Sequence, residues 1–328
     1  MIASFGYVST ALTLFDSSPS KTMTFATWSK LEKEEREQRL IQLTKTNLKN
    51  TLRIVHYNIA SEFPLYRMSS SIVPLATHPE VNWDYLKYTR EEFRAIGDLV
   101  KANGLRVSMH PNQFTLFTSE REQVTNNAIK DMEYHYAIFE AMGLEKEARI
   151  NIHVGGTYGD KDSSIARFYE NIKKLPAPVK KAMTLENDDK TYTTAETLDI
   201  CEKEGIPMMF DYHHHMANPS SVPLEELLPR FIDTWKGTGR PPKVHLSSPK
   251  TEKAYRSHHN FVGSDYVLPF FKMVKAYTDE LDVMIEAKQK DLALIQLLQD
   301  LSKVRGIKRL TGGTLLIQSL SAIVTAHG

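Results

Sequence analysis

The stretch PMMFDYHHH (207–215) decides the fold, because a short apolar run ends abruptly in an acidic residue and a row of histidines. Apolar runs of this length, bounded by polar residues, are typical of buried β-strands. An acidic side chain at the end of a buried strand is costly unless it is paired or bound to a metal. Asp211 therefore marks a strand end that is expected to carry a functional group.

The same pattern recurs along the chain in seven further runs. These are IASFGYV (2–8), LRIVHYN (52–58), LRVSMH (105–110), RINIHV (149–154), AMTLE (182–186), PKVHL (242–246) and DVMIE (282–286). The eight runs close on Tyr7, Asn58, His110, His153, Glu186, Asp211, His245 and Glu286. Helical patterns such as 29–49, 123–142 and 194–204 lie between them. This alternation predicts an α/β protein, a (β/α)8 TIM barrel with a metal site at its C-terminal mouth.

Composition sets the broad class of the protein. The 328 residues are 41% hydrophobic and 25% charged, which is typical of a globular chain, and we expect one barrel domain over 1–328. The segment 306–328 is ambiguous, since LTGGTLLIQ could pack on the barrel base or be loosely held. The single cysteine, Cys201, excludes an intramolecular disulfide and fits a reducing cytosol. No apolar run is long enough to span a membrane, and no basic region precedes the first one, so we expect a cytoplasmic protein without an obligatory protein partner.

The strand-end residues have the chemistry of metal ligands. Glu186, Asp211, His245 and Glu286 combine carboxylates with an imidazole, a set suited to Zn²⁺ or Mn²⁺. His110 and His153 could hold a neighbouring metal, with Glu186 bridging the two ions. Two bridged metals are a common device for hydrolysing phosphodiesters. His214 and His258, on loops after strands, could hold a third metal.

Most other histidines are expected to have structural roles. Neighbouring residues on a strand or helix point in different directions, so at most one or two members of the HHH run should be ligands. We favour His214 and assign His213 and His215 to support or to the surface. Isolated residues such as His56 and His135 are expected to be packing or surface residues.

Basic, hydroxyl and aromatic residues follow the same strand ends. Since the net charge is only +1, nucleic-acid binding would have to come from a local basic region. The candidate phosphate contacts are Arg67, Ser69, Ser70, Lys250 and Arg256. Gln113 and Phe114 form a polar-aromatic pair that could enter a duplex. Tyr7 and Asn58 are further candidates for DNA contact.

Lys243 lies two residues before His245 and should point to the same side of its strand. A lysine ammonium directed toward a metal cluster is unfavourable. We therefore expect Lys243 to be a neutral amine or to be chemically modified so that it carries negative charge.

The ordered motifs GYV, HYN with RMSS, HPNQ, NIHVGG, LENDD, FDYHHH, KVHLSSP, RSHH and IEAK resemble those of the UV damage endonucleases, over about 1–291. That family has a xylose-isomerase-like TIM barrel with two or three divalent metals, usually Mn²⁺, with Zn²⁺, Mg²⁺ or Co²⁺ as other options. The resemblance implies that the metal ligands are His110, His153, Glu186, Asp211, His214, His245, His258 and Glu286. It also implies a place near the scissile phosphate for His78, in ATHP, and catalytic roles for Lys243 and Glu186. Gln113 and Phe114 match the pair that wedges into the duplex.

Three positions depart from the family pattern. Phe114 stands where the family often has Tyr, which keeps the stacking surface but loses a hydroxyl. Ala11 lies near the place of a frequent Asn. His259-Asn260-Phe261 replaces a more usual Ser-Asp-Tyr. These differences affect lesion contacts more than the metal ligands.

The sequence thus predicts an enzyme that cuts UV-damaged double-stranded DNA by metal-assisted hydrolysis. The cut is expected immediately 5′ to cyclobutane dimers, 6-4 photoproducts and some abasic sites, leaving 3′-hydroxyl and 5′-phosphate ends. Three alternatives stay open: an endonuclease for abasic sites only, a metal-dependent sugar isomerase or epimerase, and a non-catalytic binder of damaged DNA. A sugar pocket would be small and closed, whereas the basic loops favour DNA.

Overall fold

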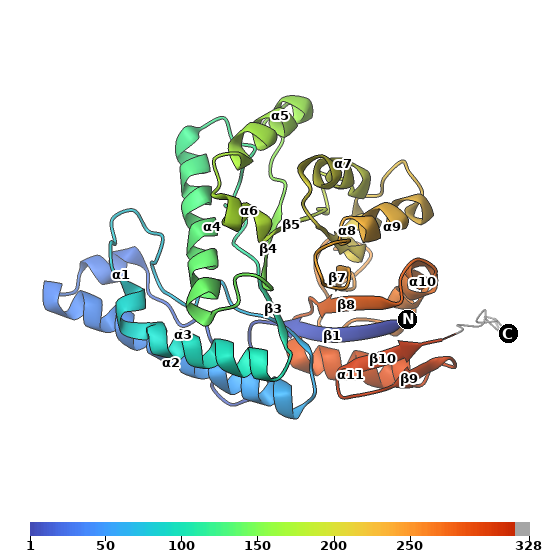
Figure 1. Ribbon diagram of the computed structural model, residues 1–328, viewed down its shortest axis with the longest axis horizontal. Helices are drawn as coiled ribbons and strands as arrows, with labels where there is room; N and C mark the ends of the chain where they lie inside the picture. Colours follow the sequence, from blue (N-terminus) through green and yellow to red (C-terminus); the bar gives the residue numbers. More distant parts are fainter. Residues whose placement is uncertain (319–328) are drawn as a thin grey trace.

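Eight parallel strands close into a barrel at the centre of the molecule (Figure 1). The computed structural model describes residues 1–318. β1 pairs in parallel with both β2 and β8, which closes the ring. The strands are β1 (Ile2–Val8), β2 (Leu65–Arg67), β3 (Arg106–Met109), β4 (Arg149–His153), β5 (Met183–Glu186), β6 (Met208–Asp211), β7 (Lys243–Leu246) and β8 (Glu280–Ile285). The predicted TIM barrel is therefore confirmed.

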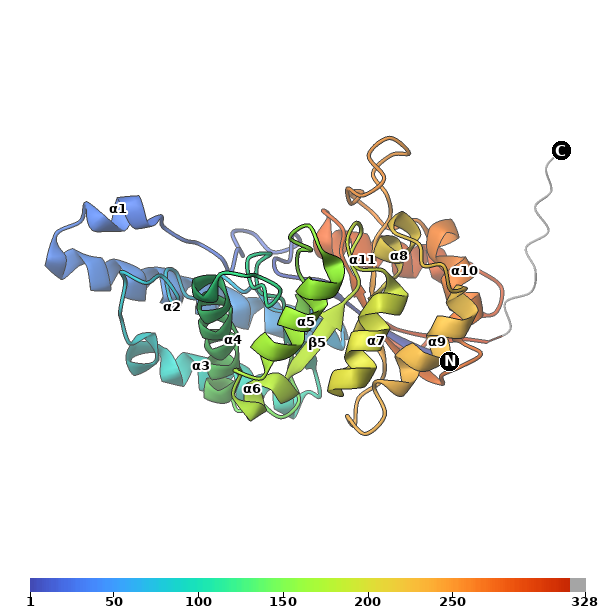
Figure 2. The same ribbon diagram turned by 90° about the horizontal axis from the view of Figure 1, so that it is seen from above.

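Helices connect the strands and cover the outside of the barrel (Figures 1 and 2). They are α1 (Phe25–Ser29), α2 (Lys33–Ala60), α3 (Tyr85–Ala102), α4 (Glu122–Met142), α5 (Lys161–Ile172), α6 (Ala177–Lys181), α7 (Thr194–Glu204), α8 (Tyr212–Ala217), α9 (Leu224–Asp233), α10 (Ser264–Val274) and α11 (Lys290–Ser302). The predicted helix 194–204 is confirmed, with a capping box formed by Thr193 and Glu196. α1 and the first part of α2 extend beyond the other helices at the left of Figure 2.

The predicted second strand, 52–58, is wrong. This segment is the last part of α2, and its buried residues continue the apolar stripe of that helix. Ile54 and Val55 are both buried in the core, so the run looked like a strand although its neighbours follow helical spacing. The actual second strand, β2, is only three residues long and begins after a short turn. Its brevity explains why no sequence pattern revealed it.

The C-terminal segment completes the sheet at the base of the barrel. β9 (Ile307–Arg309) and β10 (Thr314–Ile317) form an antiparallel pair. β10 pairs with Ile2–Ser4 of β1, below the place where β2 pairs with Gly6–Val8. The short β2 thus leaves part of β1 free for β10. Of the ambiguous segment 306–328, the part up to 318 packs on the barrel, and 319–328 lies outside the described residues.

Strands and helices share one continuous apolar core. Phe5, Ile150 and Phe210 are fully buried members from three different strands. The candidate site lies at the C-terminal ends of these strands. Within residues 1–318, no helix has both the length and the apolar character that crossing a membrane requires.

Candidate metal centre

The C-terminal ends of six strands bring carboxylates and imidazoles together at one mouth of the barrel. Register explains the convergence, because parallel strands that start at one end also finish together. His153 is aligned with Glu186 across β4 and β5, and Asp211 is aligned with His245 across β6 and β7. Residues that directly follow β3 and β8 complete the set, namely His110 and Glu286.

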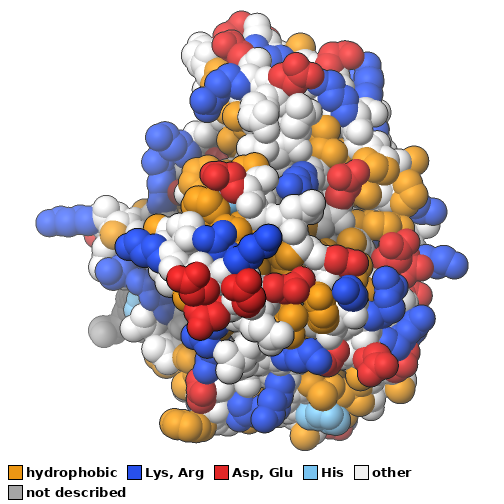
Figure 3. All heavy atoms as spheres, turned by 90° about the vertical axis from the view of Figure 1, so that its left-hand side faces the viewer, with side chains coloured by type: hydrophobic (Ala, Val, Ile, Leu, Met, Phe, Trp, Pro, Cys, Tyr) orange, Lys and Arg blue, Asp and Glu red, His pale blue; other side chains and the backbone are white. Residues whose placement is uncertain are grey.

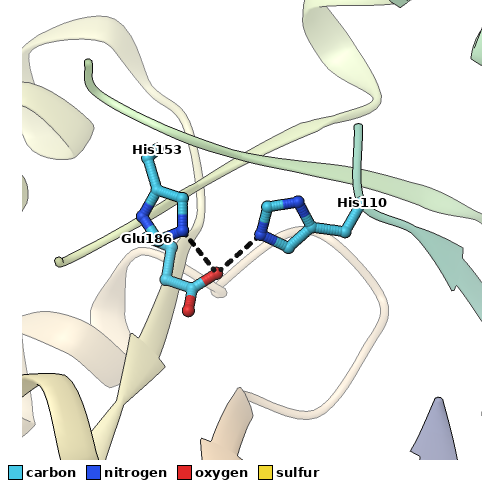
Figure 4. Close-up of side chains that lie close together, drawn as sticks. All are labelled: His110, His153 and Glu186. Carbon is cyan, nitrogen blue, oxygen red and sulfur yellow. Dashed lines mark ion pairs between the residues drawn. The ribbon is translucent and has the colours of Figure 1, made fainter. Parts of the chain in front are cut away.

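Glu186 is the centre of this arrangement and is 1% exposed. Its Oε2 lies 3.3 Å from Nε2 of His110 and 3.9 Å from Nε2 of His153 (Figure 4). Both rings point toward the same carboxylate oxygen from neighbouring strands. These three side chains form the first group able to hold a metal ion.

The second carboxylate oxygen of Glu186 faces two other groups. His245 Nδ1 lies 3.1 Å from Glu186 Oε1 and 3.0 Å from Glu286 Oε1. His214 Nδ1 lies 3.4 Å from Glu186 Oε1 and 3.7 Å from Asp211 Oδ2. Glu186 therefore belongs to all three candidate groups, which is the position that a bridging ligand occupies.

The charges of these buried groups are strongly linked. Burial would raise the pKa of Glu186, but His245 and His153 hold it well below its usual value. Burial raises the pKa of Asp211. Burial would lower the pKa of His214, yet the carboxylates of Asp211 and its neighbours raise it to about 9. The cluster thus favours positive charge next to its carboxylates, and a divalent cation would supply that charge.

Several donor atoms in the cluster have no hydrogen-bond partner among the described residues. They are Oδ2 of Asp211, Nε2 of His245 and Nδ1 of His153. A buried polar atom without a partner is unfavourable and is rare in folded proteins. Of these atoms, Oδ2 of Asp211 lies within a candidate metal group, 3.7 Å from Nδ1 of His214, and a carboxylate oxygen is a ligand of Zn²⁺ and Mn²⁺. The unpartnered nitrogens of His245 and His153 are not the ones that face Glu186, which are Nδ1 and Nε2 respectively.

Hydrogen bonds from neighbouring side chains orient the ligands, and the sequence did not reveal them. Asn151 donates from Nδ2 to Oε2 of Glu186, and Thr184 donates to Oδ1 of Asn151 over 2.8 Å. Asn187 accepts the backbone N–H of Asp211 over 2.9 Å. Asn151 lies two residues before His153, so strand alternation was a signal that could have placed it beside the cluster.

Known proteins that are similar to this chain give its family. A family model described as UV-endonuclease UvdE matches residues 3–318. The chain belongs to the UvdE family. This UvdE chain is 58% identical over 315 residues to the UV DNA damage endonuclease of Bacillus thuringiensis subsp. konkukian (strain 97-27), with 96% of the chain and 99% of that relative covered. A Bacillus anthracis protein of the same name is equally similar, at 58% identity and the same coverage.

Solved structures give the same family and fold. The crystal structure of SacUVDE superposes on the UvdE chain with a TM-score of 0.81 at 31% identity, covering 92% of this chain and 98% of that one. Endonuclease IV from Thermus thermophilus has a TM-score of 0.50 at 13% identity, covering 72% of this chain and 87% of that one. The second likeness shows a shared barrel and does not bear on activity.

The three consecutive histidines of this UvdE chain, 213–215, have different partners. His213 bonds to Ser247 Oγ at 2.7 Å and to the Tyr255 carbonyl at 2.6 Å, and His215 bonds to Thr194 Oγ1 at 2.9 Å. Of the three histidines in this run, only His214 belongs to a candidate metal group. His258 belongs to none of the three groups, although its Nδ1 lies 4.0 Å from Oε2 of Glu286.

Lys243 of the UvdE chain is buried inside the barrel. Its Nζ donates to Ser108 Oγ over 2.9 Å. Burial lowers the pKa of this amine to about 8, with Asp282 opposing that change and Arg67 reinforcing it. Lys243 is therefore held by Ser108 inside the barrel, where burial disfavours its ammonium charge.

The structure places three other expected site residues away from the cluster's ligand atoms. Tyr7 is fully buried and donates to Oδ1 of Asn58, which is itself buried on α2. The expectation that Tyr7 and Asn58 contact DNA is therefore corrected, since neither side chain reaches the surface. His78 stacks on Phe25 of α1, with ring centroids 4.2 Å apart, and joins none of the metal groups.

Four of the residues expected to contact DNA are exposed on loops that follow the strands. Gln113, Lys250 and Arg256 are exposed, and Phe114 is 71% exposed. The orange loop at the top of Figure 2 is the segment between β7 and α10 that carries the two basic residues. Basic and acidic side chains are intermixed on the flank seen in Figure 3, so no basic patch gathers on that face.

Three predicted phosphate contacts take part in internal bonds. Arg67 pairs with Oε1 of Glu286. Ser70 donates from Oγ to the carbonyl of His110 over 2.5 Å, and Ser69 is buried and caps the backbone N–H of Ser71 at 3.2 Å. In this structure these residues position the cluster and its neighbouring loops.

Proposed function

We propose that this chain is an endonuclease that cuts double-stranded DNA at UV damage. The cut is made immediately 5′ to cyclobutane dimers, 6-4 photoproducts and some abasic sites, and it leaves a 3′-hydroxyl and a 5′-phosphate. Family membership over residues 3–318 supports the reaction class. Relatives that cover almost all of the chain carry the name UV DNA damage endonuclease, which supports damaged DNA as the substrate.

Two or three divalent cations, Mn²⁺ as the first choice with Zn²⁺, Mg²⁺ or Co²⁺ as alternatives, would bind at the mouth cluster. The holding residues would be those of the three groups around Glu186, with His258 as an additional ligand. Bound there, the ions would activate water and neutralise charge on the phosphate. The unpartnered Oδ2 of Asp211, inside one of these groups, supports this assignment.

The protein's own side chains would orient the phosphate and balance its charge. Arg67, at the end of β2, forms a partly buried ion pair with Glu286, one of the candidate metal ligands. Its guanidinium is suited to contact a phosphate oxygen at the edge of the cluster. His78 would have to leave its stack on Phe25 to approach the scissile phosphate.

Lys243 is proposed to act as a neutral amine or as a modified side chain with negative charge. Burial lowers its pKa first, and Arg67 and Arg106 lower it further, which supports loss of the ammonium charge. The intact mass of gently handled protein distinguishes the two forms. An unmodified mass would exclude the modified lysine and leave the neutral amine.

The lesion would be recognised by the exposed loop pair Gln113 and Phe114. Bases that are already weakly stacked cost less to displace, so a pair that enters the duplex gains selectivity for damage. Phe114 offers a stacking surface that suits any base. Lys250 and Arg256 would contact the backbone from the loop after β7.

The observation that carries this proposal is the buried carboxylate of Glu186, shared by imidazoles from four parts of the chain. The test is incision of an end-labelled duplex with one thymine dimer, with Mn²⁺ and with or without a chelator. We expect a nick 5′ to the dimer that the chelator abolishes. A matching undamaged duplex serves as the control.

Other outcomes would redirect the assignment. Cutting of an abasic duplex alone would make the chain an abasic-site endonuclease. Chelator-resistant cutting would reject the metal site. If neither duplex is cut, an isomerisation assay with Mn²⁺ and a ketose, and a binding assay with damaged duplex, would separate the sugar enzyme from the non-catalytic binder.

A further inference from the structure

We infer that Thr115 and Asp131 form a clamp that holds the exposed pair Gln113 and Phe114 in position for damage recognition. Thr115 Oγ1 donates to Oδ2 of Asp131, which lies on α4. This role rests on the proposed function, because it concerns the same DNA-binding loop. Neither residue belongs to the candidate metal groups.

The side chains of the probing residues, Gln113 and Phe114, are exposed. Phe114 is 71% exposed, so packing cannot fix its direction. Its position must come from the backbone, which is bonded within the turn. Asn112 accepts the N–H of Phe114 through Oδ1 over 2.8 Å and the N–H of Thr115 through its carbonyl over 3.1 Å. This is a compact turn built on an Asn side chain.

The clamp fastens that turn to the body of the protein. Thr115 is 4% exposed and Asp131 is 9% exposed, so water competes little for their bond. A hydrogen bond from a hydroxyl to a carboxylate is stronger than a hydrogen bond between two neutral groups. Because Thr115 is the residue directly after Phe114, the bond acts next to the probing pair.

The same face of α4 also fixes the loop after β2. Tyr134 donates its hydroxyl to the carbonyl of Ser70 over 3.1 Å and accepts the N–H of Val73 over 3.2 Å. Ser70 in turn donates to the carbonyl of His110. α4 therefore sets the position of the probing loop relative to a candidate metal ligand. A probe displaced by about 1 Å would no longer match the spacing between lesion and cleaved bond.

The test compares Thr115→Val, which removes the hydroxyl at nearly constant volume, with Thr115→Ser, which keeps it. Thr125→Val is the matched control, since Thr125 is a buried threonine on the same helix as Asp131. Amide hydrogen exchange over 111–117 measures the clamp in the free protein. Incision of dimer-containing and undamaged duplexes with Mn²⁺ gives kcat and KM for each.

We expect Thr115→Val to speed exchange in 111–117 and to reduce the preference for damaged duplex about tenfold, mainly through KM. Thr115→Ser and Thr125→Val should behave like the wild type. Unchanged exchange, unchanged preference, or an equal loss in Thr115→Ser would each overturn the clamp. Failure of the wild type to cut the dimer duplex would overturn the proposed function, and the recognition role with it, whatever the exchange data show.

Discussion

The barrel contains a buried charged cluster and a partly buried ion pair, which differ in how many of their polar atoms have hydrogen-bond partners. The mouth cluster, centred on Glu186, has a buried carboxylate oxygen, Oδ2 of Asp211, without a hydrogen-bond partner within residues 1–318. The inner ion pair joins Arg106 and Asp282 through two bonds of 2.8 and 2.6 Å. Both are formed from parallel strands, yet only the inner pair is complete. We infer from this contrast that the inner ion pair stabilises the fold, whereas the mouth cluster is suited to bind a ligand.

The largest expected effect is on activity, at the mouth cluster. Glu186→Gln keeps the size of the side chain but removes the charge shared by all three groups. We expect incision to fall by about 10³-fold or more, equivalent to at least ~4 kcal/mol in the barrier. Single-turnover incision of the dimer duplex measures it.

Stability should respond much less than activity to this substitution. Because the imidazoles that pair with Glu186 can lose their protons when its charge is removed, no unpaired charge has to stay buried, and the free energy of unfolding of the metal-free protein should stay within about 1–2 kcal/mol of the wild type. Glu280→Gln, at an exposed carboxylate on the other end of β8, is the control and should keep full activity. Near-normal cutting by folded Glu186→Gln would reject the assignment of the cluster.

The inner ion pair should show the reverse pattern. Asp282→Ala leaves the guanidinium of Arg106, whose side chain is 24% exposed, without its partner, and losing hydrogen bonds to a partly buried charged group typically costs about 1.5–3 kcal/mol. We expect the free energy of unfolding in urea to fall by that amount, while incision by the folded fraction falls less than tenfold. Asp279→Asn, an exposed neighbour, should change stability by about 0.5 kcal/mol or less. A loss of incision of more than tenfold in the folded fraction would instead indicate that Asp282 takes part in the reaction.

A smaller effect is expected one bond away from the ligands. Asn151 orients Glu186 and is itself held by Thr184. Asn151→Ala should weaken Mn²⁺ affinity or activity about 10–100-fold, as loss of an orienting partner usually does. Mn²⁺ titration of the incision rate measures this, with Thr184→Val expected to have a weaker effect in the same direction. An unchanged Mn²⁺ curve for Asn151→Ala would show that Glu186 needs no such support.

The segment from β3 to β8 and the segment 52–58 differ in how well the sequence predicted their structure. From β3 to β8, each apolar run ended in a ligand-type residue, and parallel strands bring such ends together, so the barrel and the residues of the cluster could be predicted. At 52–58, the same apolar character belonged to the buried stripe of α2. A short run cannot distinguish a buried strand from a helix without its flanks.

The supporting residues of the site had weaker signals. Asn151 and Thr184 lie two positions before His153 and Glu186, so alternation puts each on the ligand side of its strand. Their side chains are common in many roles, and only the distance to Glu186 shows what they do. Tyr7 shows the converse, because a strand-end position alone did not predict that its hydroxyl would be buried against Asn58.

The smallest expected effect is a pH dependence of stability that only the metal-free mouth cluster should show. In the folded protein the pKa of His214 is raised to about 9, above its ordinary value of about 6.5. The contribution of His214 to the free energy of unfolding is thus complete below pH 6.5 and is lost as the pH rises through 9. The pKa of Lys243 is lowered to about 8 in the folded protein, so this residue makes the free energy of unfolding rise as the pH increases above 8. The informative window is therefore about pH 6.5 to 8, where chelator-treated protein should lose about 1–2 kcal/mol in urea unfolding. His214→Gln should flatten this slope and Asp279→Asn should not, whereas an equal slope in His214→Gln would assign the titration to another group.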